Sequence, residues 1–318
     1  MRTPGKSLPR ALGLALMACG ALAAAPQRAP VNVRPVGQIV AWDAARDGKA
    51  ATYRIGPYQL SLSALRDPDD TGPTPELTVS RADRSDVSYI GLDRGVTLAG
   101  VAGFPTARAT FTVMRLDPAA AEPAIVLTTY SGGAHCCTDI QIANPTRNSW
   151  IVTRLGQLDV DPFYQAPRDF DGDGALELVI PDDRFDYQFD AFAGSWQPVR
   201  VFGVRHGVAV DRSAEPGFRK VLADDMQKAG AACRKGQSGA CPAFIADAAR
   251  IGRFAEAWAV MLRSVRPDFE FPRTRCGAHV LVLQCPKREA QPVSDYPTAV
   301  RLALVEAGYP VPRSPAKR

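Results

Sequence analysis

Ala109-Thr110-Phe111-Thr112-Val113-Met114-Arg115-Leu116 shows the clearest regular pattern in this chain. Apolar side chains alternate with threonines over its first five residues, and this period of two is that of a β-strand with one buried face. Similar short segments occur on both sides of it, with no helical spacing between them. We therefore predict a mainly antiparallel β-rich domain over residues 51–210.

Glycine, proline, aspartate and asparagine separate the predicted strands, and these residues favour turns. In the turn Asn144-Pro145-Thr146-Arg147-Asn148, proline restricts φ and asparagine tolerates turn geometry. The other expected strands cover residues 52–55, 58–62, 76–80, 124–130, 139–143, 149–155, 176–180 and 198–204.

The apolar spacing changes near Asp211 to that of an α-helix. Phe218, Leu222 and Met226 recur on one face of the following segment, and charged side chains occupy the other face. The pattern predicts a helical C-terminal region over residues 211–310 and a basic, proline-rich, disordered tail over residues 311–318. The predicted fold class is therefore α+β.

The first 25 residues resemble an export signal. Basic residues come first, then an apolar run from Ala11 to Ala18, then small residues up to Ala25. A membrane-spanning helix needs about 20 apolar residues, so this run is too short, and no later stretch is long enough. We predict a signal peptide over residues 1–25, a loose lead-in over residues 26–50, and a periplasmic or secreted bacterial protein.

Two processing sites remain open. Ala21-Leu22-Ala23 fits an A-x-A cleavage site, which would release a protein without a lipid anchor. Leu16-Met17-Ala18-Cys19 resembles a lipoprotein signal, which would leave Cys19 as a lipidated N-terminus. Met17 is unusual at its position and apolar residues follow Cys19, so cleavage without lipidation is favoured and the envelope lipoprotein is the alternative.

The charge balance argues against polyanionic partners. The formal net charge is +5, but three basic residues lie in the predicted signal, which leaves 35 basic against 33 acidic residues. This balance lacks the basic excess that binding to nucleic acid or to an anionic membrane requires. We therefore predict no nucleic-acid partner, and a protein or another envelope ligand as the partner.

Six cysteines follow Cys19, and an even number in an exported chain indicates disulfides. Six cysteines permit about 15 pairings. Cys233 and Cys241 bracket a short glycine-containing turn, so we expect this pair first. A bond between Cys276 and Cys285 would need a bend, because an extended strand would separate them by about 30 Å.

Asp169-Phe170-Asp171-Gly172-Asp173-Gly174-Ala175-Leu176-Glu177-Leu178 places four carboxylates at relative positions 1, 3, 5 and 9. Their mutual repulsion at neutral pH favours a bound cation. Oxygen ligands in a flexible loop suit Ca²⁺ better than zinc or copper, and the two glycines can adopt positive φ. The residues therefore predict a calcium site, with an acidic turn held by Asx-type hydrogen bonds as the alternative.

This spacing, which leads into the apolar segment Leu178-Val179-Ile180-Pro181, resembles the calcium loop of FG-GAP (integrin-type) β-propeller repeats. In that family Glu177 would usually be an aspartate, and a propeller needs several copies where this chain has one. The resemblance covers the loop at 169–178 and not a propeller. It implies Ca²⁺ ligands from the side chains of Asp169, Asp171, Asp173 and Glu177 and from the backbone carbonyl of Ala175.

An EF-hand does not fit this stretch. Its twelve-residue loop requires a glutamate at position 12, where this chain has Ile180, and the flanking residues predict strands rather than helices. We expect the ion to have a structural role. Metal-assisted hydrolysis would need an open coordination position and a nearby base, for which the sequence shows no residues.

His135, Cys136 and Cys137 form a second unusual group in a glycine-rich stretch. Imidazole and thiolate bind soft metals, and a histidine can activate a thiolate, so a hydrolase or thiol-redox enzyme using these residues is the alternative function. Exported thiols tend to oxidise, which favours a disulfide anchor. We therefore predict a binding or interaction module of the cell envelope rather than an enzyme.

Overall fold

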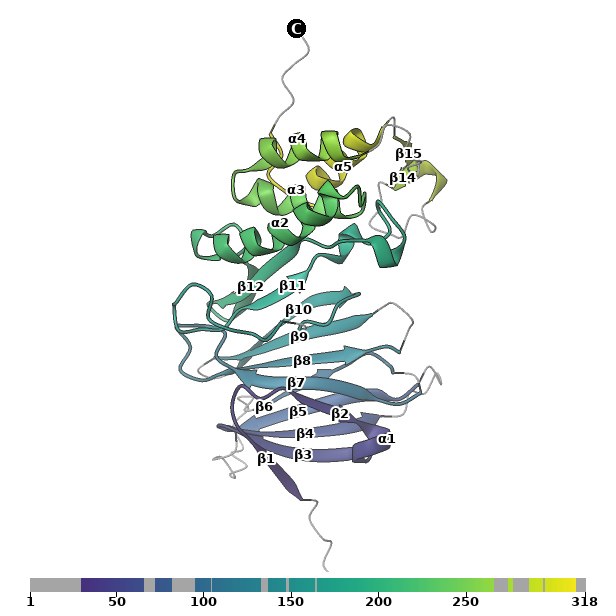
Figure 1. Ribbon diagram of the computed structural model, residues 1–318. Helices are drawn as coiled ribbons and strands as arrows, with labels where there is room; N and C mark the ends of the chain where they lie inside the picture. Colours follow the sequence, from purple (N-terminus) through teal and green to yellow (C-terminus); the bar gives the residue numbers. More distant parts are fainter. Residues whose placement is uncertain are drawn as a thin grey trace, which may run out of the picture.

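The computed structural model describes residues 30–65, 72–81, 95–103, 105–132, 137–146, 149–163, 165–265, 274–276, 286–293 and 295–312. Within these residues, mainly antiparallel sheets come first in the chain and helices come last, which confirms the predicted α+β class. The layers follow one another along the molecule, from the N-terminal sheet at one end to the helices at the other (Figure 1). The predicted signal peptide and Cys19 lie outside the described residues.

The first sheet has the strand order β1-β3-β4-β5-β6. β1 pairs in parallel with β3, and the remaining neighbours are antiparallel. The strands are β1 (Val31–Arg34), β3 (Ala50–Ile55), β4 (Tyr58–Leu65), β5 (Thr74–Arg81) and β6 (Gly95–Ala99).

The expected loose lead-in over residues 26–50 differs from the structure in its described part. β1, β2 (Val40–Asp43) and the short helix α1 (Ala44–Asp47) all lie there. Asp43 begins α1 by accepting a hydrogen bond from the Ala45 N–H. These strands form because later strands supply their hydrogen-bond partners, and a local pattern does not reveal partners so far away.

The second sheet has the order β10-β9-β8-β7-β2. Its main strands are β7 (Arg108–Met114), β8 (Ala124–Tyr130), β9 (Thr138–Pro145) and β10 (Trp150–Leu158). Phe111 and Val113 of β7 belong to the apolar core shared with the first sheet, and Met114 belongs to the core shared with the third. β7 is therefore covered on both faces, where the sequence pattern predicted one buried face.

The third sheet, of β11 (Leu178–Pro181), β12 (Val199–Arg205) and β13 (Val208–Asp211), lies between the second sheet and the helices (Figure 1). Leu178 and Ile180 of β11 pack in the core shared with the second sheet. Val179, on the opposite face, packs in the core formed with the helices. This small sheet thus joins the β part of the molecule to its helical part.

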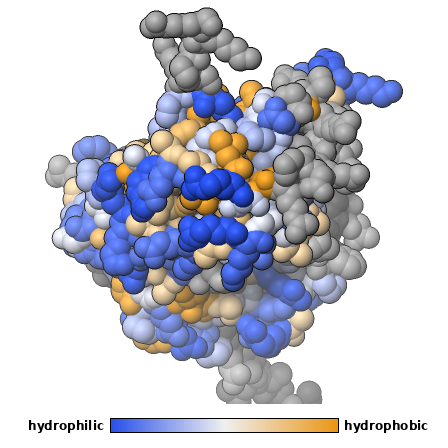
Figure 2. Space-filling model, turned by 45° about the horizontal axis from the view of Figure 1, so that its top comes forward, coloured by the Kyte–Doolittle hydropathy of each residue, from blue (hydrophilic) through white to orange (hydrophobic). Residues whose placement is uncertain are grey.

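We call helices α2 (Arg219–Arg234), α3 (Ala240–Arg250), α4 (Phe254–Ser264) and α5 (Tyr296–Glu306) the helical region. Nearly every residue of α3 is buried, so this helix forms its centre. Viewed toward this end, the surface is mainly hydrophilic, with apolar residues scattered between charged ones (Figure 2). No helix in the described parts of the chain is long and apolar enough to cross a membrane.

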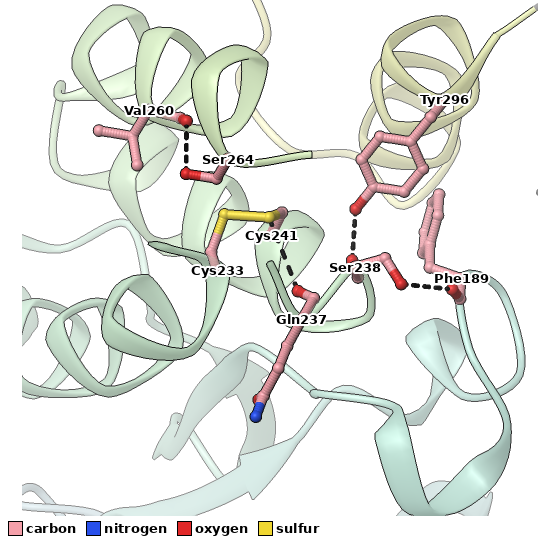
Figure 3. Close-up of a disulfide and its surroundings, with 8 residues drawn as sticks. All are labelled: Phe189, Cys233, Gln237, Ser238, Cys241, Val260, Ser264 and Tyr296. Atoms are coloured by element: carbon pink, nitrogen blue, oxygen red, sulfur yellow. Dashed lines mark hydrogen bonds between the residues drawn. A yellow bond between two sulfur atoms is a disulfide. The ribbon is translucent and has the colours of Figure 1, made fainter. Parts of the chain in front are cut away.

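A disulfide between Cys233 and Cys241 links the end of α2 to the start of α3, which confirms the pairing expected first. Beside it, the Tyr296 hydroxyl of α5 donates a hydrogen bond to the Ser238 carbonyl (Figure 3). The disulfide and this bond hold three helices around one turn. The remaining short elements are the hairpin of β14 (Thr274–Cys276) and β15 (Ala290–Pro292), and the 3-10 helices η1 (Asp183–Phe185), η2 (Phe192–Gly194), η3 (Pro216–Phe218) and η5 (Lys287–Glu289).

Candidate functional site

The acidic loop, residues 169–177, leads directly into β11. An isolated antiparallel bridge between Arg168 and Glu177 closes it, with the Glu177 N–H donating to the Arg168 carbonyl at 3.0 Å. Gly172 and Gly174 have φ of 81° and 83°, the left-handed values predicted for them. A Cβ at either position would meet no other atom within 4 Å, so their backbone conformation and not crowding accounts for glycine here.

Backbone N–H groups of the loop donate to its own carboxylates. Asp169 accepts from Gly172 at 2.6 Å and from Gly174 at 3.0 Å. Glu177 accepts from the Phe170 N–H at 3.0 Å. These hydrogen bonds are of the Asx-turn type, which the sequence offered as the alternative to a calcium site. They hold the loop in a compact turn with its carboxylates directed inward.

Carboxylate oxygens of Asp169, Asp171 and Glu177 lie within 4.8 Å of one another. Ca²⁺ binds oxygen at about 2.3–2.6 Å, so ligands on opposite sides of one ion lie about 5 Å apart, which this spacing matches. Asp173 lies outside this group of three, and its carboxylate bonds to Arg205 at 3.2 Å. Ala175, the fifth predicted ligand, follows in the loop with its side chain fully buried.

Arg212, directly after β13, is the site residue that the sequence did not reveal. Its guanidinium side chain is 2% exposed and bonds to Asp171 at 2.5 Å and to Glu177 at 2.8 Å. It also lies 3.4 Å from Asp173. These contacts join residues 35 to 41 positions apart, and no local sequence pattern signals a contact of that range.

The loop keeps an excess of negative charge. Four loop carboxylates face Arg205 and Arg212, the two arginines that bond to them, so the net charge is −2 when all four carboxylates are ionised. Burial raises the pKa of Glu177 to about 7, although the Phe170 N–H opposes the shift. Burial would also raise the pKa of Asp173, but the Ala175 N–H and Arg205 hold it below its ordinary value.

This donor set fits one divalent cation. Arg212 bonds to Oδ2 of Asp171 and Oε1 of Glu177, while Oδ1 and Oε2 each accept one backbone N–H. A carboxylate oxygen has two lone pairs, so both residues retain acceptor capacity for an ion. Hard oxygen donors and excess negative charge suit Ca²⁺, and since the ion takes about 6–8 oxygen ligands these three residues would supply part of its shell.

The second predicted group is only partly described. Cys137 is disulfide-bonded, and its N–H donates to the Ser131 hydroxyl at 2.9 Å. Cys233 and Cys241 pair with each other, so the bond of Cys137 goes to another cysteine. His135 and Cys136 lie outside the described residues. A disulfide-bonded sulfur is not a thiolate, so Cys137 in this state lacks the nucleophile that a hydrolase needs.

A polar pocket of about 390 Å³ opens at one end of the second sheet, and the sequence did not predict it. Thr128 is nearly buried there and donates to the Thr110 carbonyl at 3.3 Å. Arg108 is held by Asp43 at 3.0 Å. The pocket is lined by Arg108, Ala109, Thr110, Thr128, Tyr130, Thr138, Asp159, Val160 and Asp161.

Comparison with known proteins shows a family likeness in the helical region. Residues 218–308 match the family model described as the sll0997 C-terminal domain. This segment begins at the last residue of η3 and contains α2 to α5. No solved structure matches the chain.

Two curated relatives extend the similarity beyond that segment. A protein of Synechocystis sp. named "Probable thylakoid lumen protein sll0997" is 31% identical over 195 residues, which cover 59% of this chain and 56% of that protein. The uncharacterized protein y4bJ of Sinorhizobium fredii is 26% identical over 283 residues, which cover 86% of this chain and 43% of that protein. The chain thus spans about half the length of these relatives, and its residues 218–308 are similar to the sll0997 C-terminal domain.

Proposed function

We propose that this chain is an exported cell-envelope protein that binds one structural Ca²⁺ in its acidic loop and acts as a binding module. One observation carries the calcium proposal. Oxygens of Asp169, Asp171 and Glu177 lie within 4.8 Å of one another in a loop whose charge the neighbouring arginines leave at −2. The FG-GAP resemblance of the same ten residues agrees with it.

Asp169, Asp171 and Glu177 would hold the ion. Bound Ca²⁺ would neutralise the remaining charge and tie the loop to β11, which Glu177 directly precedes. Asp173, bonded to Arg205 and Arg212, would support the site from outside the group of three. The role is structural, because the loop positions the strand that joins the sheets to the helices.

Three features support export. The first 25 residues have the order of a signal peptide, and the Synechocystis relative is named for the thylakoid lumen, which is reached across a membrane. The Cys233–Cys241 disulfide suits an oxidising compartment. Mass spectrometry of the mature N-terminus tests this proposal: cleavage after Ala23 or Ala25 is expected, and a lipid on Cys19 would instead support the envelope lipoprotein.

Thermal unfolding tests the calcium site. We expect millimolar Ca²⁺ to raise the melting temperature of the mature protein and a chelator to reverse the shift, since a ligand at 100 times its Kd stabilises by about 2.7 kcal/mol. The Asp169→Asn/Glu177→Gln variant should lose the shift. Asp161→Asn, an exposed carboxylate outside the loop, should retain it. An unchanged melting curve of the wild type would refute the calcium proposal.

The pocket on the second sheet is where we propose that a ligand of the binding module sits. Its hydroxyls come from Thr110, Thr128, Thr138 and Tyr130, and its carboxylates from Asp159 and Asp161, while its one arginine is paired with Asp43. This lining suits a small ligand rich in hydroxyls and without negative charge. Ligand-observed NMR with neutral saccharides should show binding that Thr128→Val weakens, and no binding of such sugars would contradict this assignment.

The enzyme alternative depends on the state of the cysteines. The disulfide at Cys137 argues against a hydrolase or a soft-metal site, because a thiolate is needed both for nucleophilic attack and for soft-metal binding. A thiol-redox enzyme would instead interconvert this disulfide with two thiols. Titration of the native exported protein with a thiol reagent, before and after mild reduction, tests both points. The binding proposal predicts no reactive thiol and no disulfide that mild reduction opens, and two free thiols per chain in the native protein would return weight to an enzyme using His135 and Cys136.

A further inference from the structure

We propose that Arg212 couples cation binding in the acidic loop to the docking of the helical region. This inference rests on the proposed calcium site and adds a regulatory consequence to it. Arg212 lies directly after β13, between the last strand of the third sheet and the first turn of the helices. Its side chain bonds both to the loop and to Glu215 at the start of the helical part.

One side of the Arg212 guanidinium belongs to the loop. It bonds to Asp171 at 2.5 Å and to Glu177 at 2.8 Å, and these are two of the three residues that would hold the ion. The Arg212 side chain is 2% exposed, so water does not screen these bonds. A shift of either carboxylate would therefore move the Arg212 side chain that bonds to it.

The other contacts of Arg212 belong to the start of the helical region. Its Nη2 lies 2.8 Å from Glu215, and its guanidinium carbon lies 4.8 Å from the centre of the Phe218 ring. Phe218 is fully buried in the apolar core of the helices. Arg212 thus rests on the aromatic side chain from which α2 continues.

The loop also packs directly against this entry point. A Cβ added to Gly217 in η3 would lie 2.6 Å from the Cβ of Asp171, so the loop and the η3 backbone are in close contact. No flexible side chain separates them, because the nearest atom is the Cβ of Asp171, next to the main chain. The loop and residues 213–222 therefore share one interface, and loosening one segment should loosen the other.

The expected direction follows from the charges. Without a cation, the excess negative charge pushes Asp169, Asp171 and Glu177 apart, and Arg212 balances only part of the repulsion. A bound cation would hold the carboxylates together and so fix the oxygens to which Arg212 bonds. Coupling is reciprocal, so looser docking at η3 must also weaken cation binding by the same factor.

Hydrogen exchange on the full mature protein, with and without 10 mM Ca²⁺ (about ten times the weakest Kd of extracellular sites), tests the coupling. In the wild type we expect Ca²⁺ to slow exchange in the loop and at residues 213–222, by about 5-fold or more at the latter. Arg212→Met, which keeps an apolar stem over Phe218, should lose the slowing at 213–222. Arg253→Met, which breaks an exposed pair with Glu256 on α4, should behave as the wild type does.

Phe218→Leu provides a second test if Arg212→Met does not fold. This variant keeps every ligand and Arg212 but removes the aromatic ring on which Arg212 rests, so calorimetry should show Ca²⁺ binding weakened about 5-fold or more. Binding of Ca²⁺ with slowing confined to residues 169–178 would overturn the coupling and leave the calcium site intact. No heat of Ca²⁺ binding to the wild type would overturn the proposed site and the coupling together.

Discussion

Asp247 in the middle of α3 is fully buried, and neither of its carboxylate oxygens accepts a hydrogen bond from a donor among the described residues. Asp225 of α2 faces it, and two carboxyl groups can bond only when one carries a proton. Burial, and then the charge of Asp225, raise the pKa of Asp247 well above its ordinary value, with Asp182 adding to the shift and Arg250 opposing it. α2 and α3 therefore meet at a carboxyl pair that favours the protonated form.

Asp247→Asn should stabilise the protein at alkaline pH. A carboxyl group whose pKa is raised on folding binds protons more tightly in the folded state, so its contribution to stability falls as pH rises above about 4. Asparagine does not ionise, so the variant should be more stable than the wild type at pH 8, with the difference shrinking toward pH 4.

Urea unfolding at both pH values measures this difference. Asp224→Asn is the matched control, because Asp224 is exposed and lies next to Asp225 on α2. Its difference in stability from the wild type should not grow between pH 4 and pH 8. Parallel stability profiles for the wild type and Asp247→Asn would mean that Asp247 is not buried with a proton-sharing partner.

At the scale of elements, the packing of α2 on α3 depends on two local features. Gly230 of α2 lies against the Phe244 ring of α3, where an added Cβ would meet the ring at 2.8 Å. The Cys233–Cys241 disulfide closes the turn between the same helices. Gly230 allows the two helices to pack closely. The disulfide limits how far apart their linked ends can move in the unfolded chain.

Gly230→Ala should destabilise the protein although alanine favours helices. The gain in helix propensity is about 1 kcal/mol, whereas overpacking a buried contact costs about 1–3 kcal/mol, so the net change should be a loss. Thermal melting measures it. Adding Phe244→Leu should recover part of the loss, and a Gly230→Ala variant more stable than the wild type would show that the ring can move aside.

Replacing both Cys233 and Cys241 with serine should lower the unfolding free energy by about 2–3 kcal/mol, because the bond closes a short loop in the unfolded chain. The residues are separated by 8 positions. Denaturant unfolding of the wild type under oxidising conditions and of the variant gives the value. A loss near zero would indicate that helix packing alone already restrains the turn.

At the scale of the whole molecule, the sequence pattern correctly predicted features that depend on residues close together in the chain. The predicted strand at 124–130 coincides with β8, and the glycines of the acidic loop have the positive φ expected of them. β1 and β2 were missed because their partners β3 and β7 lie later in the chain. Arg212 and the polar pocket were missed for the same reason, since each brings together residues from distant segments.

The layered arrangement gives the acidic loop its importance. The third sheet lies between the second sheet and the helices (Figure 1). The loop leads into its strand β11, and Arg212 follows its strand β13. One loop with a net charge of −2 therefore lies at the junction of the two parts. If a cation binds there, it stabilises the contact between sheets and helices as well as the loop itself.

Calorimetric titration of the metal-free mature protein with Ca²⁺ tests this account most directly. It predicts binding of one ion per chain, with a Kd of about 1 mM or tighter, in the range of extracellular calcium sites. The Asp169→Asn/Glu177→Gln variant should show no binding heat. An equal heat in wild type and variant, or none in either up to about 10 mM Ca²⁺, would contradict the calcium site.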